Sequence, residues 1–136
     1  MLIAFCLLAV LALAAACGGG EEEEPGGGEL PEGFPQDFPL YQNAVVDVAT
    51  VAPDGEGFRV QLSSSDSPDQ VRDFYEQELD KDPWHVENVQ DIPEMATTVI
   101  AFARVDSGEE WGTVAIVTVQ ENGRRVNIAV SLTAVQ

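Results

Sequence analysis

The chain has few basic residues and few cysteines. Six Lys and Arg stand against 24 Asp and Glu, which gives a formal net charge of −18 over 136 residues. A nucleic-acid binder needs a basic face for phosphate contacts, so this balance excludes that class. The two cysteines, Cys6 and Cys17, both lie near the N-terminus, so the rest of the sequence can hold neither a disulfide framework nor a cysteine-rich zinc site. The length suits one ordinary domain.

Recognisable catalytic motifs are also missing. The sequence has no Gly-x-Ser-x-Gly nucleophile elbow, no dinucleotide fingerprint and no phosphate-binding loop. Its single histidine is His85, and its serine candidates include the polar run Ser63 to Ser65. A lone histidine on a strand is more often a surface residue than a catalytic base. We therefore expect a non-catalytic domain without a cofactor. A hydrolase that uses His85 ranks third, after the two binding hypotheses given at the end of this subsection.

Residues 1–16 form an uncharged apolar run that ends in three alanines directly before Cys17. The run is shorter than the ~20 apolar residues of a membrane-spanning helix, and its small final residues suit a signal peptidase. This N-terminus resembles a bacterial lipoprotein precursor, in which such a run ends in a lipobox, usually Leu-(Ala/Ser)-(Gly/Ala)-Cys. The resemblance implies cleavage before Cys17, diacylglycerol on its sulfur and a further acyl chain, such as palmitate, on its new amino group.

Two or three lipid chains on Cys17 would anchor the protein stably to the membrane of the bacterial cell envelope, with the domain outside the cytoplasm. An ordinary secretory signal or an uncleaved anchor is the alternative interpretation. We assign 1–16 to a signal peptide, 17–40 to the lipidated Cys17 and a flexible acidic tether, and 41–136 to a single domain. The tether is rich in Glu, Gly and Pro and has no basic residue, a composition that cannot bury enough apolar surface to order itself.

The end of the tether has a different composition, because aromatic residues alternate with prolines from Phe34 to Tyr41. We expect an extended lead-in that packs Phe38, Leu40 or Tyr41 on the domain. A proline-rich docking motif for a partner protein is the alternative.

Hydrophobic periodicity and turn residues indicate the elements of the domain. Ser67 and Gln70 form a capping box with Pro68 at the first helical position, and an apolar stripe follows it. The strand at 97–105 is apolar on both faces, so we expect it at the centre of the sheet. The pattern predicts strands at 44–51, 58–63, 84–89 and 97–105, turns at 53–57 and 106–110, and a helix from Pro68 to Asp82-Pro83.

Asn122-Gly123 lies between two alternating runs and suits a two-residue type I′ hairpin turn. Such a turn fixes the register of the two flanking strands and makes one of their faces uniformly apolar. The expected pairs are Glu121 with Arg124, Val119 with Val126, Val117 with Ile128, and Ala115 with Val130.

These elements predict an α+β fold with one helix packed on a mainly antiparallel sheet of about six strands, in the order ββαββββ. The domain resembles small exported bacterial proteins of unknown function. The shared pattern is Phe-Pro-x-Tyr-x-x-Ala at 38–44, Ser-Pro-Asp-x-Val-x-x-Phe-Tyr-x-x-x-Leu at 67–79, and Trp84 at a strand start. It consists of packing residues, so the resemblance implies no activity.

The leading functional hypothesis is an envelope-anchored lipoprotein whose domain binds a partner protein or a small ligand on its sheet or acidic rim. Ligand-binding residues are not assigned by any motif. A cation-binding or cation-sensing lipoprotein, with calcium as the cation, is the second hypothesis. The sequence shows no EF-hand pattern, and the helix dipole already explains acidic residues at a helix start, so we assign no metal site. The candidate oxygens would be those of Asp66, Asp69, Asp73, Glu76 and Asp80.

Trp84, Trp111 and Tyr41 could line an aromatic pocket for sugars or peptides. Each lies at or near a strand start, which suits packing in the core or at its rim equally well. We therefore expect packing as their role.

Overall fold

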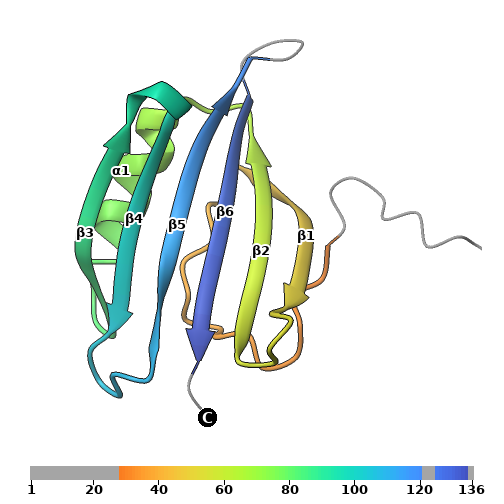
Figure 1. Cartoon of the computed structure of the whole chain (residues 1–136), viewed down its shortest axis with the longest axis vertical. Coiled ribbons are helices and arrows are strands. Elements are labelled where there is room, and N and C mark those ends of the chain that lie inside the picture. The colour runs from red at the N-terminus through yellow and green to blue at the C-terminus, as the bar shows by residue number, and fades with distance from the viewer. Residues whose placement is uncertain (1–27, 121–124, 135–136) are drawn as a thin grey trace, which may run out of the picture.

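A computed structural model describes residues 28–120 and 125–134. In these ranges the chain forms a six-stranded antiparallel sheet with one α-helix against it (Figure 1). The expected class, one helix on an antiparallel sheet, is confirmed. The expected order is matched only in part, because a 3₁₀ helix, η1 (Pro93–Met95), lies between the third and fourth strands. The other elements are β1 (Ala44–Val51), β2 (Gly57–Ser64), α1 (Pro68–Glu78), β3 (Trp84–Ile92), β4 (Thr97–Arg104), β5 (Glu110–Val119) and β6 (Arg125–Ala134).

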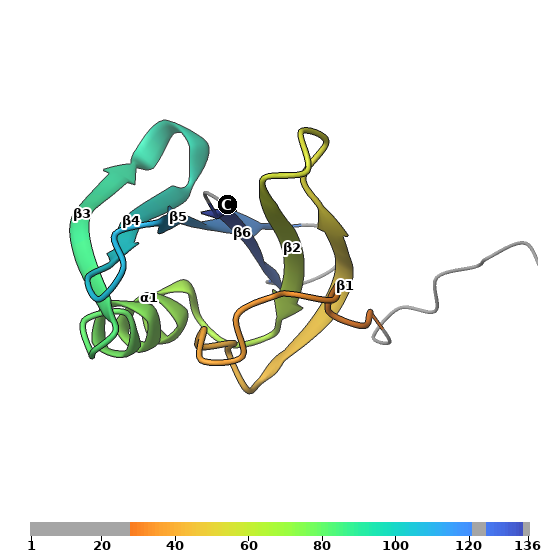
Figure 2. The same ribbon diagram turned by 90° about the horizontal axis from the view of Figure 1, so that it is seen from below.

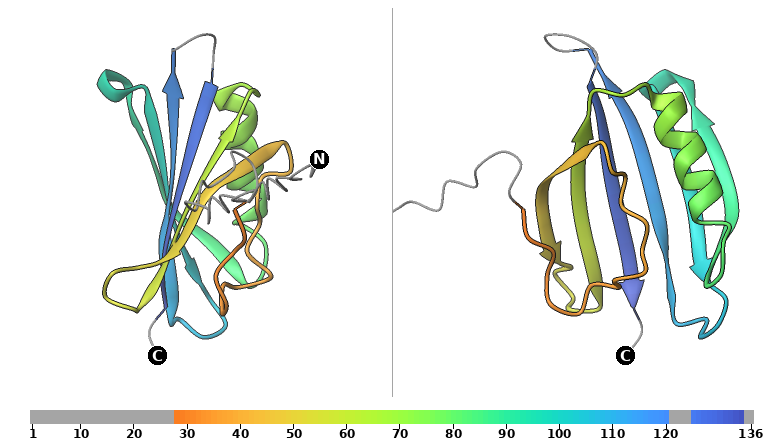
Figure 3. Two further views of the ribbon diagram at one scale, coloured as in Figure 1. Left: turned by 90° about the vertical axis from the view of Figure 1, so that its right-hand side faces the viewer. Right: turned by 180° about the vertical axis from the view of Figure 1, so that it is seen from behind.

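The strands lie side by side in the order β1-β2-β6-β5-β4-β3. The last strand of the chain therefore joins the hairpin β1–β2 to the meander β3–β5. β6 pairs with β2 on one side and β5 on the other, and every second residue of its first eight is nearly inaccessible to solvent, so one of its faces lies in the core. Figures 2 and 3 show α1 and residues 28–43 on the same face of the twisted sheet. We call this the inner face, and the opposite one the outer face.

The position of β4 corrects one prediction. β4 lies between β5 and the edge strand β3, not at the centre of the sheet. Its residues Ile100 and Phe102 point into the core and are 0% and 1% exposed. Val99, Ala101 and Ala103 alternate with them and are half-buried. Because these outer-face residues are apolar as well, β4 has the two-sided apolar pattern that is typical of a central strand.

The register of the β5–β6 hairpin corrects a second prediction, that of the residue pairs across this hairpin. Val119 pairs with Arg125, one residue away from the predicted partner Val126. β5 is apolar at both parities, so alternation alone did not identify its core side, and a one-residue slip exchanges the faces of a strand. Packing decides it, because Val114 and Ile116 are 0% and 1% exposed. The corrected pairs are Thr118 with Val126, Ile116 with Ile128, and Val114 with Val130. Glu121, Asn122, Gly123 and Arg124 lie outside the described residues.

The predicted capping box of α1 is present. The backbone N–H of Gln70 donates to Ser67 Oγ at 3.2 Å, and Gln70 Oε1 accepts from the Ser67 backbone at 3.0 Å. The helix ends at Glu78 with Leu79 as its C-cap, earlier than the predicted end at Asp82-Pro83. Turns follow Leu79, and they bring Trp84 onto the inner face. α1 buries Val71 and Tyr75 against β4 and β5, and the C-cap Leu79 continues this apolar stripe.

Candidate functional site

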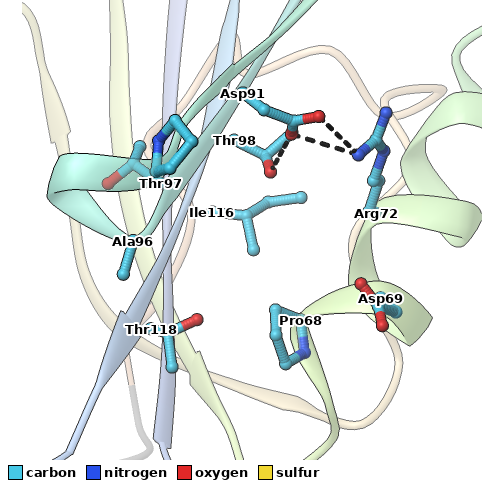
Figure 4. Close-up of a pocket in the computed structure, with 10 residues that line it drawn as sticks. Pro68, Asp69, Arg72, Asp91, Ala96, Thr97, Thr98, Ile116 and Thr118 are labelled. Carbon is cyan, nitrogen blue, oxygen red and sulfur yellow. Dashed lines mark hydrogen bonds and ion pairs between the residues drawn. The ribbon is translucent and has the colours of Figure 1, made fainter.

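A groove opens where the first turn of α1 approaches the ends of β3, β4 and β5 (Figure 4). Its volume is about 220 Å³, below the roughly 300–1,000 Å³ of typical small-molecule sites. Ile116 lies at its base and is 1% exposed. Thr98 of β4 pairs with this residue, and Thr118 follows it two positions further along β5. The groove thus offers an apolar base beside hydroxyl groups.

An ion pair between α1 and β3 forms one wall of the groove. Arg72 Nη1 donates to both carboxylate oxygens of Asp91, at 3.1 and 2.9 Å, and Arg72 Nε donates to Glu76 at 2.9 Å. Thr98 Oγ1 donates to Asp91 at 2.7 Å. The Thr98 hydroxyl, and then the Arg72 guanidinium, lower the pKa of Asp91, so this carboxylate is charged at neutral pH. The wall is therefore polar, and its charged groups are already paired with one another.

No motif in the sequence predicted this groove. The available signal was the interruption of an apolar series. On the inner face of β4, Thr98 precedes Ile100 and Phe102, and on β5 Thr118 follows Val114 and Ile116. Two threonines at core-facing positions of neighbouring strands mark where the core ends. The approach of Arg72 to Asp91 spans 19 residues of sequence and had no local signal.

Residues 28–43, which we call the strap, cover another part of the inner face beside α1 (Figure 3). Three of its rings, Phe34, Phe38 and Tyr41, are 6%, 5% and 9% exposed. The expectation that the lead-in packs Phe38 and Tyr41 on the domain is confirmed, and Leu40 packs partly buried against the same core. Phe34 and Phe38, within the stretch 17–40 assigned to the tether, therefore belong to the core.

One ion pair, which we call the latch, holds the strap to the end of β4. Arg104 donates to both carboxylate oxygens of Asp37, at 2.8 and 2.7 Å. The guanidinium lies 4.4 Å from the ring centroid of Trp84, whose Nε1 donates to the Asp37 carbonyl at 3.2 Å. Arg104 also contacts Glu110, and Asp106 lies 3.6 Å away. The hydrogen bonds from Arg104 lower the pKa of Asp37.

A second polar contact holds the other end of the strap. Tyr41 Oη donates to Asp66 Oδ2 at 2.5 Å, and Asn43 Nδ2 donates to the same oxygen at 3.1 Å. Burial, and then the Asp66 carboxylate, raise the pKa of Tyr41 to about 12. The same hydrogen bonds lower the pKa of Asp66, with Tyr41 as the larger cause. Asp66 thus has a structural role in the described chain.

Comparison with protein-family models gives one match, described as START domain-like, over residues 45–134. The chain belongs to the START domain-like family. No curated protein gives a significant match to it. The family suggests a ligand-binding domain, which is compatible with binding without catalysis. The matched range runs from β1 to β6 and includes α1, so the sheet, the helix and the groove lie within the START domain-like region while the strap precedes it.

Within this START domain-like domain, His85 and the serine candidates are not brought together. His85 lies at the start of the edge strand β3, and its Nδ1 is 3.1 Å from Asp80 Oδ1, with both side chains exposed. Ser63 and Ser64 lie on β2, near the other edge of the sheet. Their hydroxyls donate to Asp47 at 3.2 Å and to the backbone carbonyl of Asn43 at 2.8 Å. The absence of catalysis stays a prediction.

The acidic residues of the helix start do not converge. Asp66 is held by Tyr41 and Asn43, Asp69 lies at the rim of the groove, and Asp73 is exposed. In the described ranges, no group of three or more His, Cys, Asp and Glu side chains is arranged to hold a metal ion. The geometry therefore gives no support to the calcium hypothesis.

The three aromatic residues considered for a pocket lie on different faces. Trp84 and Tyr41 are buried on the inner face, whereas Trp111 is 52% exposed on the outer face of β5. Cys17 lies outside the described residues, so its lipidation stays a prediction. No helix in the described part of the chain is long and apolar enough to cross a bilayer.

Proposed function

We propose that this START domain-like domain binds a small ligand without catalysis, in the groove between α1 and β3–β5. The observation that carries the proposal is the groove itself, an open end of the inner face with the apolar Ile116 at its base and the Arg72–Asp91 pair in its wall. A small number of placed polar groups beside an apolar surface is the usual composition of a ligand site. The family match supports the same class of function.

The groove and its surroundings favour a small neutral or cationic amphiphile. Ile116 accommodates the apolar part of the ligand, and the Thr118 hydroxyl can bond its polar part. The Thr97 hydroxyl donates to the Met95 carbonyl at 2.8 Å and can only accept from the ligand. Residues 41–136 carry 17 acidic and 6 basic residues, a net charge of −11. This field repels anions and attracts cations. The Arg72 guanidinium is already engaged by Asp91 and Glu76, which also disfavours an anionic ligand.

A pair of matched variants tests the groove. Thr118 lines the groove, whereas Thr113 lies on the opposite face of β5. Thr118→Phe fills the groove, and Thr113→Phe adds the same ring on the outer face. The full chain is screened by thermal shift against neutral, cationic and anionic amphiphiles of low molecular weight. A ligand at 100 times its Kd stabilises the domain by about 2.7 kcal/mol.

We expect the hits to come from the neutral and cationic groups, to lose their effect in Thr118→Phe and to keep it in Thr113→Phe. Hits that stabilise both variants equally would place binding elsewhere and contradict the proposal.

We further propose that lipid on Cys17 anchors the domain to the cell envelope membrane, outside the cytoplasm. The lipobox-like end of the apolar run supports this part of the proposal. The test compares the full chain and Cys17→Ala in bacterial cells by membrane fractionation and by cross-linking. Release of Cys17→Ala from the membrane supports a lipid anchor, and a cross-linked protein lost in the same variant would identify a partner. Equal membrane association of the two chains would refute the anchor.

A further inference from the structure

The strap differs from the rest of the inner face in how it is bonded. Local turns use most of its backbone hydrogen bonds. The N–H groups of Phe34, Phe38 and Ala44, the first residue of β1, donate to carbonyls three residues earlier in the strap, at 3.1, 3.2 and 3.2 Å. Among the described residues, the backbone-to-backbone hydrogen bond that joins the strap to a strand is Gly28 N–H to the Val46 carbonyl, at 3.2 Å. The other bonds of the strap backbone to the domain are made with side chains: Trp84 Nε1 and Ser64 Oγ donate to the carbonyls of Asp37 and Asn43, and the Tyr41 N–H donates to Tyr75 Oη at 3.3 Å. The strap can therefore leave the sheet without breaking the ladder of any strand pair, which is the condition for a low-energy local opening.

The strap covers a surface built from aromatic rings. Phe34 meets Phe58 of β2 edge-on, with ring centroids 5.5 Å apart. Phe38 meets Trp84 and Phe102 at 5.6 and 5.4 Å. Edge-to-face contacts are the preferred geometry of such pairs, because the positive edge of one ring faces the negative face of another. Removal of the strap would uncover Phe58 on β2 and, beyond the two intervening strands β6 and β5, the adjacent rings of Phe102 and Trp84 on β4 and β3.

We propose that the strap is a displaceable cover, and that a neutral, ring-bearing apolar ligand enters the inner face by replacing the rings of Phe34 and Phe38. Each ring contact that the strap gives up is regained with the ligand, so ligand and strap compete for one surface. The inference rests on the proposed function in that the START domain-like domain binds a ligand on its inner face. It adds a second place of binding and the segment that controls it, both distinct from the groove.

The latch sets how easily the strap opens. Asp37 is the residue of the strap that pairs with Arg104, and the Arg104 side chain is 13% exposed. Asp106 contacts the same guanidinium at 3.6 Å, but it follows β4 and does not belong to the strap. Asp37→Asn and Asp106→Asn thus remove the same charge from the same neighbour, and only the first weakens the strap. They form a matched pair for the test.

Amide hydrogen exchange of the full chain measures the opening directly. We expect exchange at Phe38 and Tyr41 to be about fivefold faster in Asp37→Asn, the factor given by loss of one partly exposed ion pair. Exchange in β6 should not change, and Asp106→Asn should match the wild-type chain. Strap amides that exchange at the rate of β6 in every variant would show that the strap opens only on global unfolding, which would overturn the proposal.

Binding of N-phenyl-1-naphthylamine, a neutral aromatic dye, tests the competition. We expect Asp37→Asn to bind the dye about fivefold more tightly than the wild-type chain, and Asp106→Asn to bind it equally well. An affinity unchanged by Asp37→Asn would overturn the strap proposal. If the dye is then lost in Thr118→Phe, the groove stands and the strap fails. Tighter dye binding in Asp37→Asn, with no amphiphile bound in the groove, would support the strap and refute the groove.

Discussion

Gly112 gives the sharpest test of how closely the inner face is packed. It lies in β5, opposite Phe102 of β4 and Leu132 of β6. A methyl group added at its Cα would overlap the Ser131 backbone carbonyl oxygen, and it would lie 3.0 Å from both the Leu132 Cα and the Phe102 ring. Two of these atoms belong to the backbone of the central strand, which cannot rotate away. Gly112→Ala therefore requires β5 and β6 to move apart.

The cost follows from the kind of atom that must move. Overpacking of a core costs about 1–3 kcal/mol and occasionally more, and backbone overlap in a central strand pair belongs at the upper end, near 3 kcal/mol. A small domain has a free energy of unfolding of about 5–15 kcal/mol. At roughly 4–8 °C per kcal/mol for a domain near 100 residues, the melting temperature should fall by about 12–24 °C.

Gly108→Ala is the matched control. Gly108 has a φ of 66°, and no atom lies within 4 Å of an added methyl group. Alanine there costs about 1 kcal/mol of backbone strain, or roughly 4–8 °C. Both variants are measured by thermal unfolding monitored by circular dichroism. A melting temperature of Gly112→Ala equal to or above that of Gly108→Ala would refute the close approach of β5 and β6 at this position.

Three further predictions concern capping and charge. Ser67→Ala removes the capping box of α1 and should cost about 1 kcal/mol in urea unfolding, and Ser67→Asp should restore most of it; equal stability of Ser67→Ala and the wild type would contradict the role of the cap. Asp37, Asp66 and Asp91 all have a pKa below the ordinary 3.8 in the folded chain. As the pH falls, these carboxylates therefore take up protons in the unfolded chain before they do so in the folded chain. The stability they provide is complete above about pH 4–5 and is lost as the pH falls through their folded pKa values, and Asp37→Asn should reduce this loss in acid titrations followed by fluorescence. Moderate NaCl should raise the melting temperature by screening the net charge of −11 on 17 acidic and 6 basic residues; a melting temperature independent of salt would count against self-repulsion.

Local signals predicted the helix start and the strand positions well. The capping box between Ser67 and Gln70 is a contact over three residues, so the sequence contains both partners side by side. β1 coincides with the valine-rich run 44–51, because β-branched residues favour a strand wherever the strand finally lies. The end of α1 was less predictable, since the turns after Leu79 form where the chain must reach Trp84 on the inner face.

The long-range contacts that build the site gave no local signal. The latch joins Asp37 and Arg104 across 67 residues of sequence, and the groove exists because α1 approaches β3 at one end. In their local sequence, neither Asp37 nor Arg104 differs from an ordinary charged residue on the surface. Their partnership depends on β4 and the strap meeting at the same end of the inner face, which follows from the order of strands in the sheet.

The sequence by itself determined the class of fold, the cap of the helix and the acidic character of the domain, because each depends on composition or on residues within a few positions of one another. The tertiary structure alone decided the register of β5 on β6, the place of β4 next to an edge strand, and the packing of Phe34 within the core. Both parities of β5 are apolar, so either face satisfies local alternation. The free energy gained when Val114 and Ile116 meet Ile128 and Val130 beneath the helix selects one of them.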